Sequence, residues 1–544
     1  MAKQLPTVPE ARHRYPHASA LIARAVSRRS ILGSLAGIAG AAALSACGST
    51  STGTPTVAAS TAVAAVAATA TTGTTTAAPA SGSSSAGPTT TQAIATQTAS
   101  SAQPATATAA SSASGTQAAS ASQAASANAV SQAAVPLDYA APLAASDLPF
   151  MQQVIDTFQA QNPGIKINFN NITGPYETGV IPTWAAAGSL PDVLFVRGAY
   201  TGEFVAKQFI QAIDDLIARD AKEVDTADLW PQQVESDFKF RGKWYLLPYD
   251  FSILGIYYNK TLFQARGMAE PTKDWSWTDL QDLGQKLTVT SGGQRTQWGL
   301  GNLPRISEVQ AHLWAAGGAL LSADLSTCVV NDPAYAAKNA TILQYFADLS
   351  NVQHIVPTAS EFKGNPFGLD RSGLEVDGSW ATLSYRLQIK KQFDWDVQWW
   401  PQNKETGKRG VVAAGAGESI GPTTKRRDTA WTWLKALTSR EALVTMIANP
   451  IRSVPGRQSA AQVWTATVKS GALAPQHANV FPDMFSASFP QHPITFRTQL
   501  NTISGKVLGP VFTGQKRASD VLLDWQQQVA YVISQDKQHY GYVS

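Results

Sequence analysis

The order of hydrophobic and polar residues changes period repeatedly along residues 138–544. The first segment, Leu148–Ala160, has four apolar residues at the i, i+3, i+4, i+7 spacing that puts them on one face of a helix: Met151, Val154, Ile155 and Phe158. Asn162-Pro163-Gly164 then supplies a turn. Apolar residues alternate with polar ones from Ile165 to Phe169, which is typical of a strand. The pattern therefore predicts a helix, a turn and a strand in succession.

A second strand lies between helical segments. Val193–Val196 is a short apolar run of the kind that forms a strand buried on both faces. Helical segments end near Gly188 and start near Glu203, and this alternation predicts a parallel sheet with crossover helices. The later chain continues the alternation, and strands are expected at Trp244–Pro248 and Ile253–Tyr258. Helices are expected after the Ser276–Asp279 capping box, from Asp332 to about Leu349, from Asp428, and after Ser519-Asp520.

Charge divides the chain into three parts. Residues 1–47 hold six lysines and arginines and one acid, and no charged residue occurs from Gly48 to Leu137. Without those residues, the 42 basic and 38 acidic residues become 36 and 37. The net charge of +4 therefore belongs to the N-terminal part, and the rest has no basic excess that would indicate a nucleic-acid partner.

The N-terminal part has the pattern of an export signal. Arg28-Arg29 precedes the apolar run Ile31–Ala46, which is too short and too rich in glycine for a stable membrane span. The paired arginines favour the twin-arginine route over the general secretory route. The run ends at Leu44–Cys47, which resembles the bacterial lipobox, so residues 1–46 are expected to be a signal peptide and Cys47 to be acylated. Ordinary cleavage and an uncleaved anchor are the alternatives.

Residues 47–137 are expected to be a disordered stalk. They consist almost wholly of Ala, Ser, Thr, Gln and Gly with scattered Pro, and large apolar side chains that could offset the entropy of ordering are scarce. A glycosylated stalk and an Ala-rich helix stay open as alternatives. The 407 residues that follow contain all 15 tryptophans and are long enough for two or more lobes. The two cysteines, Cys47 and Cys328, do not indicate a disulfide framework.

Several segments of residues 138–544 together resemble the extracellular solute-binding proteins of carbohydrate ABC importers, the family that includes maltose-binding protein. The segments, in order, are Phe158–Ile167, Ala186–Val193, Gly242–Tyr249, Tyr257–Phe263, Trp277–Leu280, Gly317-Gly318 and Gly378–Ala381. No single one is specific, and the signal lies in their order over most of the globular part.

The resemblance implies an α/β fold of the type II periplasmic-binding-protein kind. Each lobe has a central, mostly parallel sheet flanked by helices, and hinge strands cross between the lobes near Phe251–Gly255 and Ala413–Ser419. The expected N-lobe is residues 138–252 with 416–465, and the expected C-lobe is residues 253–415 with 466–544. Ligand binds in the cleft and favours the closed form, because only that form contacts it with both lobes.

A sugar site needs polar groups for hydroxyls and aromatic rings for the apolar faces. Trp380 lies in a loop that resembles a family loop facing the cleft. Tyr249 and Asp250 end a strand beside the expected hinge. Tyr176 and Tyr200 each lie beyond the carboxyl end of an expected strand, where open α/β sheets bind ligands. Packing in the core is the alternative for each ring.

Three further candidates complete the expected site. Trp314 precedes Gly317-Gly318 and faces either the cleft or a helix core. Glu418 follows the small-residue run Ala413–Gly417 and either binds hydroxyls or caps a helix. Arg452 follows Asn449-Pro450 and either reaches the ligand or forms a surface salt bridge.

Other classes of function have weaker signals. Tyr257-Tyr258 would suggest a ferric site, but neighbouring strand residues point to opposite faces, and the histidines lack metal-ligand spacing, so neither a metal nor a cofactor is expected. Hydrolase motifs are absent from the globular part, so an enzyme such as a glycosidase is not expected. The predicted protein is a monomer, lipid-anchored outside the cytoplasmic membrane, that delivers a mono- or oligosaccharide to a permease. The same fold could instead serve a polyamine, an anion or a peptide.

Overall fold

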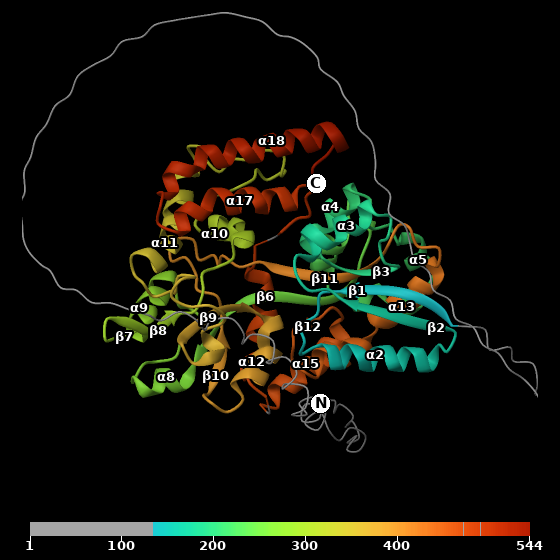
Figure 1. Ribbon diagram of the computed structural model, residues 1–544, viewed down its shortest axis with the longest axis horizontal. Helices are drawn as coiled ribbons and strands as arrows, with labels where there is room; N and C mark the ends of the chain where they lie inside the picture. The colour runs from blue at the N-terminus through green and yellow to red at the C-terminus, as the bar shows by residue number, and fades with distance from the viewer. Residues whose placement is uncertain (1–133, 472, 490) are drawn as a thin grey trace, which may run out of the picture. The chain divides into compact units, whose positions relative to one another are not determined.

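The computed structural model describes residues 134–471, 473–489 and 491–544 (Figure 1). The expected signal peptide, Cys47 and nearly all of the expected stalk lie outside the described residues. The first described strand, β1 (Val135–Ala141), starts three residues before Asp138, where the globular part was expected to begin. Val135, Pro136 and Leu137 pair with residues 165–167, and Leu137 is fully buried, so the last residues assigned to the stalk already belong to the sheet.

Three parallel strands form one side of the main sheet. β1 pairs in parallel with β2 (Ile165–Asn171) and with β3 (Val193–Arg197). The predicted helix between the first two strands is confirmed as α2 (Leu148–Gln161), and the four apolar residues that predicted it are buried. Shorter helices follow: α3 (Ile181–Ala186), α4 (Thr201–Ala206), α5 (Asp214–Arg219), α6 (Ala221–Val224) and α7 (Pro231–Gln233).

One long strand, β6 (Leu247–Asn259), joins the two sides of the molecule (Figure 1). The sequence predicted two strands here, because polar residues interrupt the apolar pattern, but the backbone runs on without a break. The first part of β6 pairs with β11 (Ala413–Ile420) and β12 (Val454–Pro455). Its second part, from Leu254, pairs with β9 (Ser372–Gly378) and β10 (Trp395–Gln398). β6 therefore changes partners between Ile253 and Leu254.

We name the two sides by these partners. The N-side consists of β1–β3, β11, β12 and the first part of β6, and the C-side consists of β7–β10 and the second part of β6. The sheet order is β2-β1-β3-β11-β6-β9-β8-β7. The remaining strands are β4 (Lys239–Phe240), β5 (Lys243–Trp244), β7 (Val289–Ser291) and β8 (Gln294–Leu300). β8 and β9 are parallel, whereas β6 and β11 are antiparallel to their neighbours. The sheet is therefore mixed, and among the described strands only β1–β3 and the β8–β9 pair have the parallel arrangement that was expected to dominate each lobe.

Helices cover the C-side and the end of the chain. The Ser276–Asp279 capping box is confirmed at the start of α9 (Trp277–Leu287). The helix expected from Asp332 starts four residues later, at Ala336, because residues 332–335 form a turn instead. The other helices are α8 (Lys260–Ala265), α10 (Val309–Ala315), α11 (Ala336–Asn351), α12 (Thr382–Ile389), α13 (Arg427–Leu437), α14 (Arg440–Leu443), α15 (Gln458–Lys469), α16 (Val480–Asp483), α17 (Arg497–Phe512) and α18 (Leu522–Tyr540).

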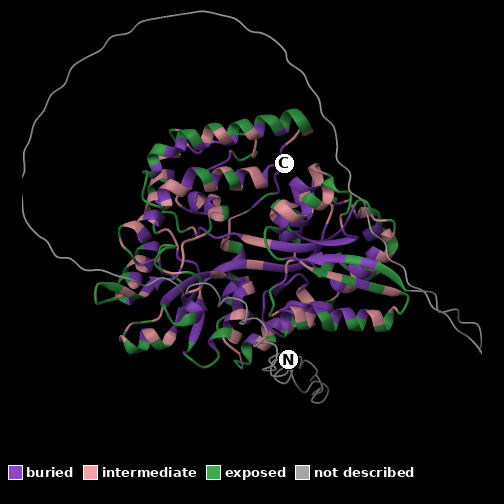
Figure 2. Ribbon diagram, in the orientation of Figure 1, coloured by how far each residue is buried: buried purple, intermediate pink, exposed green. Residues whose placement is uncertain are grey.

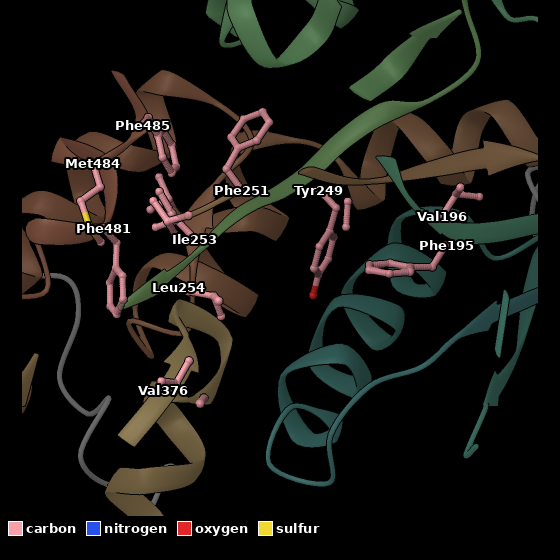
Figure 3. Packing of buried hydrophobic residues seen from close by; sticks show 14 of the residues in the cluster. Phe195, Val196, Tyr249, Phe251, Ile253, Leu254, Val376, Phe481, Met484 and Phe485 are labelled. Atoms are coloured by element: carbon pink, nitrogen blue, oxygen red, sulfur yellow. The ribbon is translucent and has the colours of Figure 1, made fainter. Parts of the chain in front are cut away.

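The sheet lies in the buried interior, and exposed residues gather on the outer faces of the helices (Figure 2). Aromatic and aliphatic side chains pack where β6 changes partners (Figure 3). Phe251 meets Phe485 edge to face with ring centroids 6.1 Å apart, and Tyr249 meets Phe195 at 5.7 Å. Gly255 is required here, because a Cβ at this position would lie 2.9 Å from Val397 and 3.0 Å from Phe481. The crossing is therefore closely packed against the segment 480–485.

Candidate functional site

A cavity of about 690 Å³ lies over the crossing and is lined from both sides of the molecule. We call its lining residues the N-side wall and the C-side wall. The N-side wall includes Asp147, Phe195, Arg197, Tyr200, Asp250 and Arg452. The C-side wall includes Arg305, Glu308, Asn365, Asp377, Trp380, Ser384, Tyr385 and Gln388, and Gln491, Arg497 and Asn501 complete the lining from the segment at the start of α17. A polar cavity of this volume is large enough for a small organic ligand.

Four of the eight residues predicted from the sequence line this cavity. They come from four separate segments: Tyr200, Asp250, Trp380 and Arg452. The fold brings together residues as far apart in the chain as 200 and 452 because β3, β6 and β12 lie near one another in the sheet and Trp380 follows β9 directly.

An ion-pair triad forms the centre of the N-side wall. Arg452 donates from Nε to Asp147 at 2.7 Å and from Nη1 to Asp250 at 2.8 Å. All three side chains are buried, at no more than 10% exposed. Burial raises the pKa of Asp250, and Arg452 opposes this shift. The Arg452 guanidinium is thus held in place by two carboxylates, and the triad carries a net negative charge when both are ionised.

Trp380 has a different kind of partner on the C-side wall. The Arg305 guanidinium lies over the ring of Trp380, 4.9 Å from its centroid. Arg305 is also 3.6 Å from a carboxylate oxygen of Asp377. The hydroxyl of Tyr385 donates to Asp377 at 3.0 Å, and the amide of Asn365 donates to Tyr385 at 2.7 Å. This wall therefore combines an aromatic face with a chain of hydrogen bonds that ends in a carboxylate.

Glu308 adds a second carboxyl group to the C-side wall. Its Oε2 is inaccessible to solvent and has no hydrogen-bond partner among the described residues. Burial raises the pKa of Glu308 to about 7, and Arg305 opposes this shift. Burial likewise raises the pKa of Asp377. Among the described residues, neither acid has a cation as close as Arg452 is to the two acids of the opposite wall.

Tyr200 and Arg497 meet where α17 contacts the N-side. Asn501 donates to the Tyr200 hydroxyl at 3.4 Å. Arg497 donates to the carbonyl of Ala199 at 3.3 Å and to that of His492 at 3.2 Å. Burial lowers the pKa of Arg497 to about 10. These contacts link the C-terminal segment directly to the end of β3.

The structure places Tyr176 and Glu418 away from the cavity. The Tyr176 hydroxyl donates to the carbonyl of Ala140 at 3.2 Å under the sheet. The Glu418 carboxyl accepts from the Tyr139 hydroxyl at 3.0 Å, and burial raises its pKa well above the usual range. Both side chains are essentially inaccessible to solvent, which leaves no surface for a ligand.

Tyr249 and Trp314 also lie outside the lining. The Tyr249 side chain is buried behind the N-side wall, where its ring packs on Phe195 and lies 5.7 Å from the Arg452 guanidinium, so it supports two lining residues without lining the cavity itself. Trp314 sits at the end of α10, where it meets Phe489 with ring centroids 5.7 Å apart and carries Lys408 on its face at 4.5 Å. Packing in the core or against a helix, the alternative to ligand contact, therefore describes both residues.

Most polar lining residues had no signal in the sequence. Arg305, Glu308 and Asp377 belong to no motif, and Asp147 simply precedes a helix. One signal was available, because Asp377 directly precedes the Gly378–Ala381 segment that singled out Trp380. Polar residues beside a candidate aromatic residue would have identified this part of the wall.

Two kinds of feature are absent from the described residues. In the described ranges, no group of three or more His, Cys, Asp or Glu side chains is arranged to hold a metal ion. Within the same ranges, no helix has both the length and the apolar character needed to cross a membrane.

The family model for bacterial extracellular solute-binding proteins matches residues 140–443, more than half of the chain. The chain belongs to this family. The matched range runs from β1 to α14 and includes both walls of the cavity except Arg452 and the C-terminal segment. The family resemblance inferred from the sequence is therefore confirmed, and membership of an extracellular family implies an exported protein.

Curated relatives match a smaller part of the chain. Binding proteins of Brucella abortus and Brucella suis are each 25% identical to it over 186 residues, which is 34% of this chain and 43% of their own length. The chain thus aligns with less than half the length of these relatives.

Solved structures show the same fold at low sequence identity. An ABC substrate-binding protein of Listeria monocytogenes in complex with cycloalternan is 19% identical, with a TM-score of 0.66 over 73% of this chain and 99% of its own. The maltodextrin-binding domain of Bdellovibrio bacteriovorus, bound to maltotriose, is 19% identical, with a TM-score of 0.61 over 74% and 100%. A Mycobacterium tuberculosis protein in complex with glycerophosphocholine is 18% identical, with a TM-score of 0.62 over 74% and 99%. The α/β periplasmic-binding-protein fold expected from the sequence is confirmed.

Proposed function

We propose that this solute-binding protein captures a mono- or oligosaccharide in the cavity between the N-side and the C-side and delivers it to the permease of an ABC importer. The observation that carries the proposal is the composition of the cavity. Trp380 offers an aromatic ring for the apolar face of a sugar, and the surrounding carboxyl, hydroxyl and amide groups can hydrogen-bond to its edge. Both walls contribute, as a ligand that favours the closed form requires.

The relatives support a carbohydrate over other solutes. Two of the three solved structures named above are bound to oligosaccharides, cycloalternan and maltotriose. The third, bound to glycerophosphocholine, shows that the same fold can hold a ligand that is not a sugar. A polyamine, an anion or a peptide is therefore the second candidate class. The family is one of binding proteins, and on this proposal the acids of the cavity bind hydroxyls and do not catalyse hydrolysis.

The N-terminal part extends the proposal to the place of action. The Leu44–Cys47 lipobox pattern supports acylation of Cys47, and the uncharged residues 48–134 would give the binding part a long tether to the outer face of the cytoplasmic membrane. Metabolic labelling with a palmitate analogue tests this. Label is expected on the wild type and not on Cys47→Ala, and equal labelling of both would contradict the tether.

The ligand proposal is tested by a thermal-shift screen with mono- and oligosaccharides, polyamines, amino acids and phosphates. A ligand that binds only the native protein raises the melting temperature. At least one sugar is expected to do so in the wild type and to do so less in Trp380→Ala. If polyamines shift the melting temperature while no sugar does, the carbohydrate proposal fails. Hydrolysis of a chromogenic glycoside that Asp250→Asn abolishes would favour an enzyme instead.

A further inference from the structure

The face of Trp380 is already occupied by a positive charge of the chain itself. The Arg305 guanidinium lies 4.9 Å from the ring centroid and 3.6 Å from the Asp377 carboxylate. An aromatic face beside a carboxylate is a favourable place for any cation, because the ring quadrupole and the negative charge both attract it. The arrangement therefore defines a cation-binding position inside the cavity.

When it is ionised, Glu308 adds a second negative charge to this position, which Arg305 alone cannot balance. It lines the same cavity, three residues along the chain from Arg305. Its Oε2 has neither solvent nor a hydrogen-bond partner within the described part of the chain. A carboxylate in such surroundings is costly unless a cation or a proton comes to it. One guanidinium thus faces two carboxyl groups, Asp377 and Glu308.

Arg305 is held much less firmly than the arginine of the opposite wall. The Arg305 side chain is 53% exposed and lies 3.6 Å from Asp377, whereas Arg452 is 10% exposed and donates to two carboxylates within 2.8 Å. An ion pair as exposed as that of Arg305 contributes little to stability. The guanidinium of Arg305 can therefore leave the ring for solvent at little cost.

We propose that Trp380, Asp377 and Glu308 form a subsite for an ammonium group of the ligand, and that Arg305 occupies this subsite until the ligand replaces it. The proposal rests on the proposed carbohydrate function and narrows it to amino sugars with a free amine. A neutral ring that stacked on Trp380 would displace Arg305 and leave two carboxyl groups without a nearby cation. An ammonium group exchanges one positive charge for another and keeps the charges balanced.

Two other arginines that line the cavity, Arg197 and Arg497, already have partners and do not favour an anionic ligand. Arg197 is paired with Glu177. Arg497 donates to the carbonyls of Ala199 and His492. A negative group would have to compete with these partners, whereas an ammonium group has to compete only with the exposed side chain of Arg305.

The test compares sugars that differ in the group at one carbon of each ring, with a charged amine in place of a neutral group. The three β-1,4 disaccharides cellobiose, N,N′-diacetylchitobiose and chitobiose carry a hydroxyl, an acetamide and an amine at the same carbon, and glucose, N-acetylglucosamine and glucosamine repeat the series as single rings. Spermidine is the ammonium ligand without a sugar. Isothermal titration calorimetry of the whole protein, at a pH that protonates the amines, measures each affinity. The variants are Glu308→Gln, Arg305→Ala and the matched control Glu405→Gln, whose side chain is exposed outside the cavity.

The amine is expected to bind at least about tenfold more tightly than its neutral counterpart, a difference of about 1.4 kcal/mol. Glu308→Gln should remove that preference, Arg305→Ala should strengthen amine binding because its competitor is gone, and Glu405→Gln should change neither. Neutral sugars that bind as tightly as the amines would overturn the subsite and leave the carbohydrate function standing. Glu308-dependent binding of spermidine without binding of any sugar would overturn the carbohydrate function and support the subsite. If no ammonium ligand binds, the subsite is overturned.

Discussion

The two walls of the cavity hold their charges in opposite ways. On the N-side wall, Arg452 is buried between Asp147 and Asp250 and bonds to both. On the C-side wall, Arg305 is more than half exposed and approaches Asp377 only to 3.6 Å, while Glu308 is left without a close cation. The charged groups of the N-side wall bond to one another without a ligand, whereas on the C-side wall Arg305 is easily replaced. The contrast indicates that the N-side wall keeps the site in shape and that the C-side wall supplies selectivity.

The largest effect is expected from the buried triad. Arg452→Met should lower the free energy of unfolding by about 3–5 kcal/mol, because it leaves two buried carboxylates without their cation. Denaturation by urea measures the loss. The same change in an Asp147→Asn/Asp250→Asn background should cost much less, since no charge is then left unpaired. Equal losses in both backgrounds would show that Arg452 stabilises the wall by packing and not by charge.

The aromatic platform is expected to matter for affinity more than for stability. Trp380→Ala should weaken binding of the sugar identified by the screen by about 1–3 kcal/mol, roughly 5- to 150-fold, and should leave the melting temperature nearly unchanged because the ring is only half-buried. Calorimetry measures the affinity. Trp314→Ala, a tryptophan outside the cavity, is the control and should leave the affinity as it is. Unchanged affinity in Trp380→Ala would remove this residue from the site.

Glu308 should make stability depend on pH. Its folded-state pKa, about 7, lies above its ordinary value of 4.5, so the folded protein binds this proton more tightly than the unfolded chain does. The free energy of unfolding should therefore fall by about 2 kcal/mol as the pH rises from 4.5 to 7. Urea denaturation at several pH values measures the slope, and Glu308→Gln should reduce it. An identical slope in the variant would mean that the carboxyl group is not buried as described.

The smallest effect on stability is expected at Arg305. Arg305→Ala should change the free energy of unfolding by less than about 1 kcal/mol, because the ion pair and the contact with Trp380 are largely exposed to solvent. Urea denaturation beside Arg452→Met gives the direct comparison of the two walls. A loss as large as that of Arg452→Met would contradict the view that Arg305 is replaceable.

Local sequence patterns predicted the local structure well. Helical spacing identified α2, and the Ser276–Asp279 capping box marked the start of α9. The break expected within β6 did not occur, because pairing on both edges by β9–β12 holds the strand together where its own sequence is polar. Long-range pairing of this kind leaves little trace in a local pattern.

The site was only half predictable for related reasons. Tyr249 and Asp250 are neighbours on β6, and the pairing register with β11 shifts at Tyr249, so the sequence does not show which of the two reaches the cavity. Trp380 could be found through its resemblance to a family loop. Arg305, Glu308 and Asp377 meet only because the turn before α10 packs beside β9, and no spacing along the chain reveals that meeting.

Hydrogen–deuterium exchange of the protein with and without the tightest-binding sugar of the screen tests the central claim most directly. A ligand that bridges the two walls should slow exchange on both, at residues 197–204 and 412–416 of the N-side and at residues 305–312 and 377–388 of the C-side. The stalk residues before 130 should exchange equally in both samples. Protection confined to one wall or lying elsewhere, or the absence of any sugar that binds, would contradict the account of a carbohydrate held between the two sides.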